Sequence, residues 1–290
     1  MISFDLVLDA IVAGILLGGF YAAVSLGISV AFGLLDVVNI AHPAFVILGS
    51  YTAYIVNSRL GLDPILAGAV FMPVFFLLGM GVYGLYYVSF ERRGQQALRG
   101  LVFFFGLVFI IEVSLLLVYG VDYRSVNAGY IGRTLELGPV QIAFRLAIPC
   151  LVALALTAAI YLFLGRTFWG RAVQAVAQDS VALRLMGANP VRIKSLAFGI
   201  AIATASLAGS LLILVGPVEP SIEREYIGRV FAITVLGGMG SVGGTLAAAL
   251  IVGVLESVTA TLYGPSWAPA VSFGILLLVL ALRPAGLFGR

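Results

Sequence analysis

The stretch Leu236-Gly237-Gly238-Met239-Gly240-Ser241-Val242-Gly243-Gly244 lies inside a long and mostly apolar part of the chain, residues 227–262. As one continuous helix at 1.5 Å per residue, residues 227–262 would be about 54 Å long, far more than the roughly 30 Å of bilayer hydrocarbon. Five of the eight residues from 237 to 244 are glycine, which is a poor helix former. We therefore expect two helical pieces here, separated by the glycine-rich stretch.

The composition of the whole chain places this broken segment in a membrane. Hydrophobic residues make up 62% of the 290 residues and charged residues 10%, against about 45–50% and about 25% in ordinary globular domains. The mean hydropathy of +1.15 is spread along the whole length, which excludes soluble, disordered and collagen-like proteins. Continuous apolar runs also argue against a barrel, whose strands alternate polar and apolar residues. We expect an all-α integral membrane protein with a single domain over residues 1–290.

About eight segments are long and apolar enough to be transmembrane helices, at least one of them discontinuous. They are residues 7–32, 41–57, 65–88, 101–119, 141–164, 192–215, 227–262 and 268–282. The first follows Asp5 and Asp9 rather than basic residues, and it is longer than the apolar region of a signal peptide. We expect it to remain as a helix.

The basic residues indicate how the helices are oriented, because cytoplasmic loops of membrane proteins carry an excess of Lys and Arg. Arg92, Arg93 and Arg99 lie between the third and fourth segments, and residues 166–194 hold five more basic residues. Both loops are expected on the cytoplasmic side. Eight simple crossings would then leave Arg283 and Arg290 outside, against the same rule, so one segment must be irregular.

Two positions are candidates for the irregularity. The first is the break within residues 227–262. The second is Asn39-Ile40-Ala41-His42-Pro43, where the proline can start or kink a helix close after the first segment. Discontinuous helices are typical of transporters, because non-helical backbone at membrane depth is tolerated only against protein or along a water-filled path.

Several other chemistries are excluded or disfavoured by the residues present. The net charge of +3 is too small and too dispersed for nucleic acid, and a single cysteine and a single histidine, Cys150 and His42, offer neither a disulfide nor a metal-ligand cluster. The residues from Gly238 to Gly243 match G-x-G-x-x-G, but inside a membrane segment this pattern indicates close packing or a broken helix rather than a dinucleotide site. No Walker A sequence and no nucleophile elbow occur. We predict no catalytic residues, no metal and no cofactor.

Polar residues inside the apolar segments are candidates for a solute path. Glu112 and Glu256 lie within spans, where a charge costs about 2.5–3.5 kcal/mol even on insertion scales. Each either lines a polar path or is hydrogen-bonded between helices, and the same two alternatives apply to Asn39 and His42. The full set of path candidates is Asn39, His42, Glu112, Gly238, Gly240, Ser241 and Glu256.

The most specific feature is the cytoplasmic loop 165–194. Apolar residues recur at helical spacing at Val173, Val176, Ala177 and Val181, which predicts a short amphipathic helix pair ending near Gly187. An exposed amphipathic helix needs a groove or a membrane surface to cover its apolar face.

Three stretches resemble one family, the permeases of bacterial branched-chain amino acid ABC importers of the LivH type. The loop from Gly170-Arg171-Ala172 through Ala175-Val176-Ala177-Gln178-Asp179 to Leu185-Met186-Gly187-Ala188-Asn189 is similar to that family's cytoplasmic stretch. Residues 37–42 (VVNIAH) and 236–241 (LGGMGS) also resemble it, and the likeness covers nearly the whole chain. Pro43-Ala44 departs from the family's glycine and acidic residue, and Val181-Ala182-Leu183 stands where many ABC permeases have Glu-Ala-Ala.

The resemblance implies an ABC importer permease fold in the bacterial inner membrane, surrounded by lipid. It further implies a second homologous permease, two cytoplasmic ABC ATPases that hydrolyse ATP, and a periplasmic solute-binding protein, whereas this chain is a non-catalytic transport subunit that binds no nucleic acid. The expected solutes are branched-chain or related amino acids. The residues expected to couple to the ATPase are Gly170, Arg171, Ala177, Gln178, Asp179, Ala182 and Gly187.

Rival functions remain open at this point. An ABC permease for another small solute, such as urea or amides, aromatic acids, a sugar or a nucleoside, would share these features. A gradient-driven secondary transporter would use Glu112 and Glu256 but has no reason to present a docking helix in the 165–194 loop. A purely structural membrane scaffold is disfavoured by the broken helix and the buried carboxylates.

Overall fold

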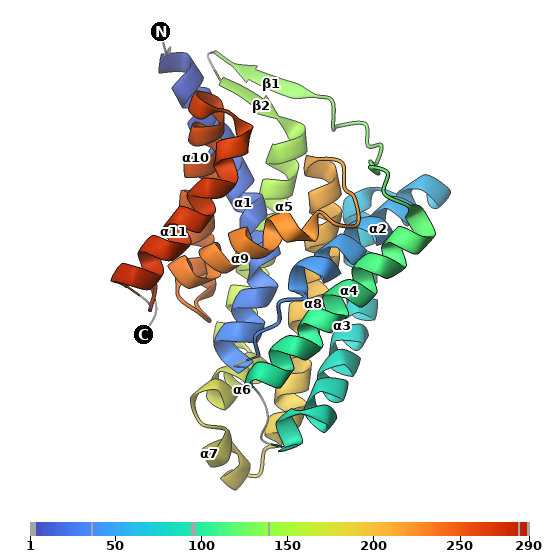
Figure 1. The fold of residues 1–290 in the computed structure, drawn as a ribbon, viewed down its shortest axis with the longest axis vertical. Helices are drawn as coiled ribbons and strands as arrows, with labels where there is room; N and C mark the ends of the chain where they lie inside the picture. Colours follow the sequence, from blue (N-terminus) through green and yellow to red (C-terminus); the bar gives the residue numbers. More distant parts are fainter. Residues whose placement is uncertain (1–3, 36, 94–96, 139, 284, 289–290) are drawn as a thin grey trace.

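The computed structural model of the chain describes residues 4–35, 37–93, 97–138, 140–283 and 285–288. These residues form a bundle of helices whose long axes mostly run between two ends of the molecule (Figure 1). The helices are α1 (Phe4–Leu35), α2 (His42–Leu60), α3 (Pro64–Ser89), α4 (Ala97–Tyr119), α5 (Phe144–Arg166), α6 (Phe168–Gln178), α7 (Ser180–Leu185), α8 (Pro190–Val215), α9 (Glu223–Gly237), α10 (Val242–Tyr263) and α11 (Ala268–Leu282). Two 3-10 turns, η1 (Glu91–Arg93) and η2 (Pro265–Trp267), complete them.

Within this described part of the chain, seven helical stretches are long and apolar enough to cross a membrane. They lie in α1, α3, α4, α5, α8 and α10, with the seventh running from Pro265 through α11. The helical membrane fold expected from composition is therefore confirmed. The remaining expected segments correspond to α2, and to α9 ahead of α10.

The expected break inside residues 227–262 is present. Helix α9 ends at Gly237 and α10 begins at Val242. Gly238 and Gly240 between them have φ of 86° and 82°, a left-handed backbone that glycine adopts without the steric cost of a Cβ. Helix α9 begins at Glu223, four residues before the expected start, and lies across the bundle while α10 runs along it (Figure 1).

The second expected discontinuity is also present. Helix α1 ends at Leu35, and the chain runs from the far end of α1 back toward the middle of the bundle before α2 begins at His42 (Figure 1). Pro43 sits in the first turn of α2, where its missing N–H costs no helical hydrogen bond. Both ends of this connection are buried, since Leu35 and His42 are 3% and 0% exposed.

Small residues let the central helices approach closely. A Cβ at Gly49 of α2 would lie 2.7 Å from the Ala205 carbonyl oxygen of α8, and a Cβ at Gly253 of α10 would lie 2.5 Å from Gly18 of α1. Membrane helices lack a hydrophobic driving force between them, so such backbone contacts supply much of their association. Helix α8 is thereby enclosed, and nearly all of its residues from Ala201 to Leu214 are buried.

A small hairpin was not expected from the sequence. Strand β1 (Thr134–Leu137) pairs antiparallel with β2 (Val140–Ala143), with Thr134 opposite Ala143 and Leu137 opposite Val140. The segment expected to be helical from residue 141 therefore begins three residues later, at Phe144. The prediction of an all-α protein needs this one correction, at the end of the bundle where the N-terminus lies (Figure 1).

The two basic loops meet at one end of the molecule. Lys194 Nζ of α8 lies 2.7 Å from Glu91 Oε1 of η1, so the α3–α4 connection and the 166–194 region are in direct contact. Helices α6 and α7 project from this end, the N-terminus lies at the opposite end, and α11 brings the chain back from the N-terminal end (Figure 1). This path agrees with one irregular segment before the C-terminus; Arg290 itself lies outside the described residues.

Candidate functional site

Helix α9 carries two arginines, each paired with a carboxylate that the sequence places inside a span. Arg229 Nε lies 2.9 Å from Glu256 Oε1 and 3.0 Å from Glu256 Oε2, which joins α9 to α10. Arg224 Nη2 lies 2.6 Å from Glu112 Oε1, which joins α9 to α4. The transverse helix is therefore held by ion pairs to two different helices.

The Glu256 carboxylate is saturated with donors. Besides Arg229, the Tyr21 hydroxyl of α1 donates to Oε2 at 2.7 Å, and the Ser272 hydroxyl of α11 donates to Oε1. The Arg229 guanidinium also stacks over the rings of Tyr21 and Tyr226, 5.0 and 5.1 Å from their centroids. With Glu256 only 2% exposed, the arrangement satisfies a buried charge by pairing and hydrogen bonding, as a charge in an apolar interior requires.

The ion pair between Arg224 and Glu112 has one exposed partner, unlike the pair between Arg229 and Glu256. The Glu112 side chain is 5% exposed, whereas the Arg224 side chain is 66% exposed. Glu223 precedes Arg224 and is 1% exposed, and its carboxylate lies 3.9 Å from Arg224 Nε without a hydrogen-bonding partner among the described residues. Two carboxylates thus share one partly exposed arginine at the start of α9.

Asn39 and His42 are buried next to one another in the α1–α2 connection. The Asn39 side chain accepts a hydrogen bond from the Ala41 N–H at 3.1 Å, and His42 Nε2 lies 3.2 Å from the Val24 carbonyl oxygen of α1. A Cβ at Gly27 would overlap the His42 ring. In the isolated chain these two residues fix the re-entrant connection, and neither faces a described cavity.

Gly238, Gly240 and Ser241 form the turn between α9 and α10. The Ser241 hydroxyl accepts a hydrogen bond from the Gly244 N–H at 3.1 Å and caps α10. The turn is packed against α1, because a Cβ at Gly33 would overlap the backbone of Gly240. It also meets the C-terminal segment, where the Leu287 N–H donates to the Leu236 carbonyl at 2.8 Å.

Helix α6 lies on the bundle through one face. Gly170, Val173 and Val176 are buried, and the Thr167 hydroxyl caps the helix by accepting from the Gly170 N–H at 2.9 Å. A Cβ at Gly170 would overlap the Phe163 carbonyl of α5, so glycine is required for this approach. Arg171, Ala177 and Gln178 are not among the buried residues of α6.

Helix α7 projects further and has no buried residue. Asp179 starts it, with Oδ1 accepting from the N–H groups of Val181 and Ala182 at 2.8 and 2.9 Å. Gly187 ends the pair with φ of 84°. Large apolar side chains on α6, on α7 and on the residue that ends α7 are exposed. They are Phe168, Trp169, Val181, Leu185 and Met186, at 73%, 53%, 67%, 85% and 84% exposed.

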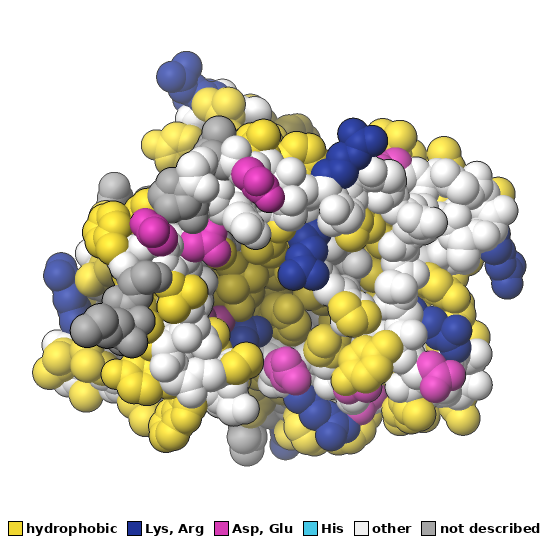
Figure 2. All heavy atoms as spheres, turned by 90° about the horizontal axis from the view of Figure 1, so that it is seen from above, with side chains coloured by type: hydrophobic (Ala, Val, Ile, Leu, Met, Phe, Trp, Pro, Cys, Tyr) yellow, Lys and Arg dark blue, Asp and Glu magenta, His cyan; other side chains and the backbone are white. Residues whose placement is uncertain are grey.

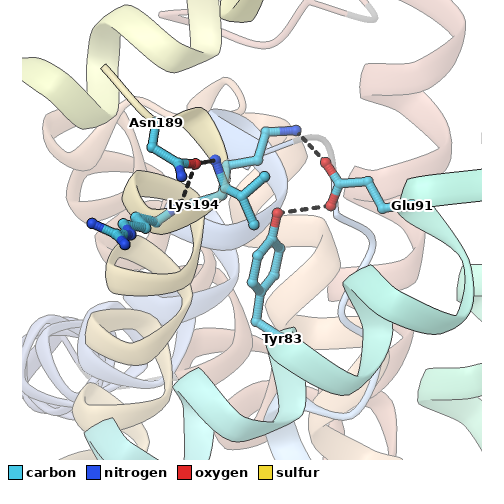
Figure 3. A network of polar contacts seen from close by, with 6 residues as sticks. Tyr83, Glu91, Asn189 and Lys194 are labelled. Atoms are coloured by element: carbon cyan, nitrogen blue, oxygen red, sulfur yellow. Dashed lines mark hydrogen bonds and ion pairs between the residues drawn. The ribbon is translucent and has the colours of Figure 1, made fainter. Parts of the chain in front are cut away.

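A polar network fastens the base of these helices to the bundle (Figure 3). Glu91 receives Lys194 Nζ on Oε1 and the Tyr83 hydroxyl on Oε2, both at 2.7 Å. On the neighbouring turn Asn189 Oδ1 accepts from the Val191 and Arg192 N–H groups and caps α8. The end of α3 and the start of α8 are thus joined where α7 leads into α8.

The expected site residues therefore fall into separate groups. The coupling residues lie together on α6, α7 and the turn at Gly187, while the path candidates divide among the α1–α2 connection, the α9–α10 turn and the two ion pairs of α9. Sequence reasoning missed Arg224 and Arg229 as site residues. Part of the signal was present, because a carboxylate inside a span is almost always paired, and Arg224 and Arg229 lie just before and just inside the start of the segment 227–262.

The end opposite α6 and α7 is hollowed near its middle, with hydrophobic side chains in the depression and both acidic and basic side chains around it (Figure 2). At this end, the connection after α4 is paired with the connection between α8 and α9. Arg124 and Val218 exchange backbone hydrogen bonds of 2.8 and 2.9 Å, and the Tyr130 hydroxyl donates to Asp63 at 2.8 Å.

Broken helices, a hollowed end and a projecting amphipathic helix pair at the opposite end define a transport permease. The chain belongs to the family described as the permease component of the branched-chain amino acid transport system, whose model matches residues 10–280. It is thus an ABC permease, a non-catalytic, multi-pass membrane subunit of an inner-membrane system, and family permeases function with partner subunits.

Curated relatives agree with this assignment over nearly the full length. The high-affinity branched-chain amino acid transport system permease protein BraD of Pseudomonas aeruginosa is 28% identical over 98% of this chain and 96% of its own. The corresponding protein LivH of Escherichia coli K12 is 28% identical over 96% and 94%. LivM of Salmonella typhimurium is 28% identical over 92% of this chain and 67% of its own. No solved structure matches the chain significantly.

Proposed function

We propose that this chain forms, with a second homologous permease, the membrane path through which branched-chain or related amino acids are imported. The observation that carries the proposal is the set of exposed apolar residues at the start of α6 and on α7, which project from the basic end of a chain of this family, while the apolar residues Val173 and Val176 of α6 pack on the bundle. Exposed side chains as apolar as Leu185 and Met186 need a covering partner. A groove on a cytoplasmic ABC ATPase provides that cover.

The coupling residues have distinct roles in this proposal. Gly170 lets α6 lie against α5, Asp179 and Gly187 fix the start and end of α7, and Arg171, Ala177, Gln178 and Ala182 belong to the surface presented to the ATPase. Movement of the ATPases reaches the bundle through α8 and the Glu91–Lys194 contact. Nucleotide shifts the bundle between two states only to the extent that it binds them with different affinity.

A paired permease and a solute-binding protein complete the proposed system. The similarity of this chain to both LivH and LivM supports two related permeases around one path. The hollowed end opposite α6 and α7 is the proposed docking face for a periplasmic solute-binding protein. Glu112, Glu256 and their arginines fix α9 next to the path. Asn39 and His42 hold the α1–α2 connection, and the Gly238–Ser241 turn holds the break between α9 and α10.

The proposal is tested by purifying the tagged chain from its native host in mild detergent and identifying the co-purifying proteins by mass spectrometry. We expect a second permease and an ABC ATPase, whose solute-binding protein is then titrated with leucine, isoleucine, valine, urea, aromatic acids and ribose. Purification of the chain alone would favour a gradient-driven carrier. An ATPase together with a binding protein selective for urea or ribose would support the assignment as an ABC permease and contradict the assignment of amino acids as its solute.

A further inference from the structure

A polar cavity lies between helices α6 and α7 on one side and the bundle on the other. Its volume is about 530 Å³, and its lining residues come from four different regions. They are Leu35, Tyr87, Glu91, Arg92, Val176, Ala177, Gln178, Ser180, Arg184, Pro190, Val191 and Lys194. The volume is in the range of ordinary small-molecule sites, about 300–1,000 Å³.

The charges that line this cavity do not balance. Among the described residues of the lining Glu91 is the one acidic residue, and both of its carboxylate oxygens are occupied, by Lys194 and by Tyr83 (Figure 3). Arg92 of η1 and Arg184 of α7 remain, and neither has a carboxylate within ion-pair distance among the described residues. Asp179 is not among the described lining residues, and its Oδ1 accepts from two amides of α7.

The remaining lining suits an anion that carries a small organic group. The Ser180 hydroxyl, the Gln178 amide and the Tyr87 hydroxyl are hydrogen-bonding groups on the lining, and Leu35, Val176 and Val191 supply apolar contacts. Guanidinium groups bind phosphate oxygens in a bidentate manner, which ammonium groups cannot do. Arg92 of η1 and Arg184 of α7 both line this cavity. A phosphate group can offer more acceptor oxygens and more negative charge than a carboxylate, so it suits two arginines better.

We propose that this cavity binds a phosphate-bearing anion that joins Arg92 of η1 to Arg184 of α7. Such a ligand links the projecting helix α7 to the bundle and stabilises the spacing between them seen in this structure. The cavity lies at the basic end of the membrane helices, so the phosphate can come from an anionic phospholipid headgroup or from a soluble phosphate compound. Binding here is independent of the transported solute, but Ala177 and Gln178 line the cavity and also belong to the surface proposed for the ATPase, so the two proposals share these residues.

The test measures binding to the delipidated protein, purified with whichever subunits accompany it. The probes are short-chain phosphatidylglycerol, inorganic phosphate and, as a neutral control, short-chain phosphatidylcholine, and the readout is amide hydrogen exchange over α6 and α7. We expect phosphatidylglycerol, inorganic phosphate or both to slow this exchange, and the Arg92→Gln/Arg184→Gln variant to bind at least about tenfold more weakly. Arg166→Gln removes an exposed arginine at the same end, outside the lining, and serves as the matched control.

Each outcome has one meaning. A response to phosphatidylglycerol alone identifies a lipid headgroup as the source, and a response to inorganic phosphate identifies a soluble one. The proposal is overturned if no probe slows exchange, if phosphatidylcholine acts as strongly as phosphatidylglycerol, or if Arg166→Gln weakens binding as much as the double variant. Unchanged gel-filtration profiles of both variants establish that loss of binding is not loss of folding.

Discussion

Arg229 and Glu256 form a buried ion pair in which one guanidinium N–H is shared between both carboxylate oxygens, at 2.9 and 3.0 Å. The pair joins the transverse helix α9 to α10, and Tyr21 and Ser272 extend it to α1 and α11. Four helices therefore meet at one carboxylate. This geometry favours a positioning role for Glu256 over direct contact with solute.

Breaking this pair should destabilise the protein strongly. Arg229→Met leaves the Glu256 charge buried without its cation, and loss of one partner of a buried pair typically costs about 3–5 kcal/mol. We expect the double variant Arg229→Met/Glu256→Leu to be more stable than Arg229→Met alone, as measured by thermal unfolding in detergent. Glu256→Gln should lower the unfolding temperature without raising the KM of uptake. A raised KM in a fully folded Glu256→Gln protein would instead place this residue on the path.

The Arg224–Glu112 pair should matter more than an exposed arginine normally does. Arg224→Gln removes the cation from a carboxylate that is only 5% exposed, and an unsatisfied buried group costs about 1–3 kcal/mol. The comparison is Arg133→Gln, an exposed arginine in the loop before β1, where surface substitutions stay within about 0.5 kcal/mol. Thermal unfolding measures both. Equal stability of the two variants would contradict a structural role for the Arg224–Glu112 contact.

The break between α9 and α10 depends on a glycine in a different helix. Gly33→Ala places a Cβ against the backbone of Gly240, and overpacking of this kind costs about 1–3 kcal/mol. Gly243→Ala is the matched control, because Gly243 lies in the first turn of α10 with nothing within 4 Å of its Cβ position. We expect Gly33→Ala to lower the unfolding temperature and Gly243→Ala to leave it unchanged or raise it. The reverse order would mean that the turn is not packed as described.

Asp179 separates two roles of the coupling loop. Asp179→Ala removes the cap of α7, a loss of about 1 kcal/mol, and should reduce uptake while ATP hydrolysis by the assembled complex persists. Asp179→Asn keeps a capping oxygen and removes the charge. If Asn restores uptake, the cap is what matters; if uptake stays low with Asn, the carboxylate itself contacts the ATPase. Normal uptake in Asp179→Ala would remove this residue from the coupling set.

The helices of this protein could be predicted from the sequence because membrane spans are long and uniformly apolar. The boundaries of α3 fall within one residue of the apolar run 65–88, and α9 and α10 together cover the run 227–262, whose break followed from length and glycine content. The sequence indicates that Glu256 needs a cationic partner but not which residue supplies it, because only the transverse course of α9 brings Arg229 to it. The β1–β2 hairpin was missed because its strands are four residues long and adjoin an apolar helix.

The coupling helices α6 and α7 could be predicted from the sequence better than the surroundings of the path candidates. Helical periodicity indicated α6 and α7, because an amphipathic face repeats along a local sequence. The surroundings of Asn39 and His42 depend on α1 and α8 packing around them, which no local pattern records.

The backbone bridge between Arg124 and Val218 joins two distant stretches of sequence into one continuous surface. Arg124 follows α4, and Val218 precedes the first residue of α9 by five positions. A load applied to either stretch is shared with the other, and through Glu223 and Arg224 it reaches the helix that crosses the bundle. A protein seated on this surface would therefore contact the ends of α4 and α9 together.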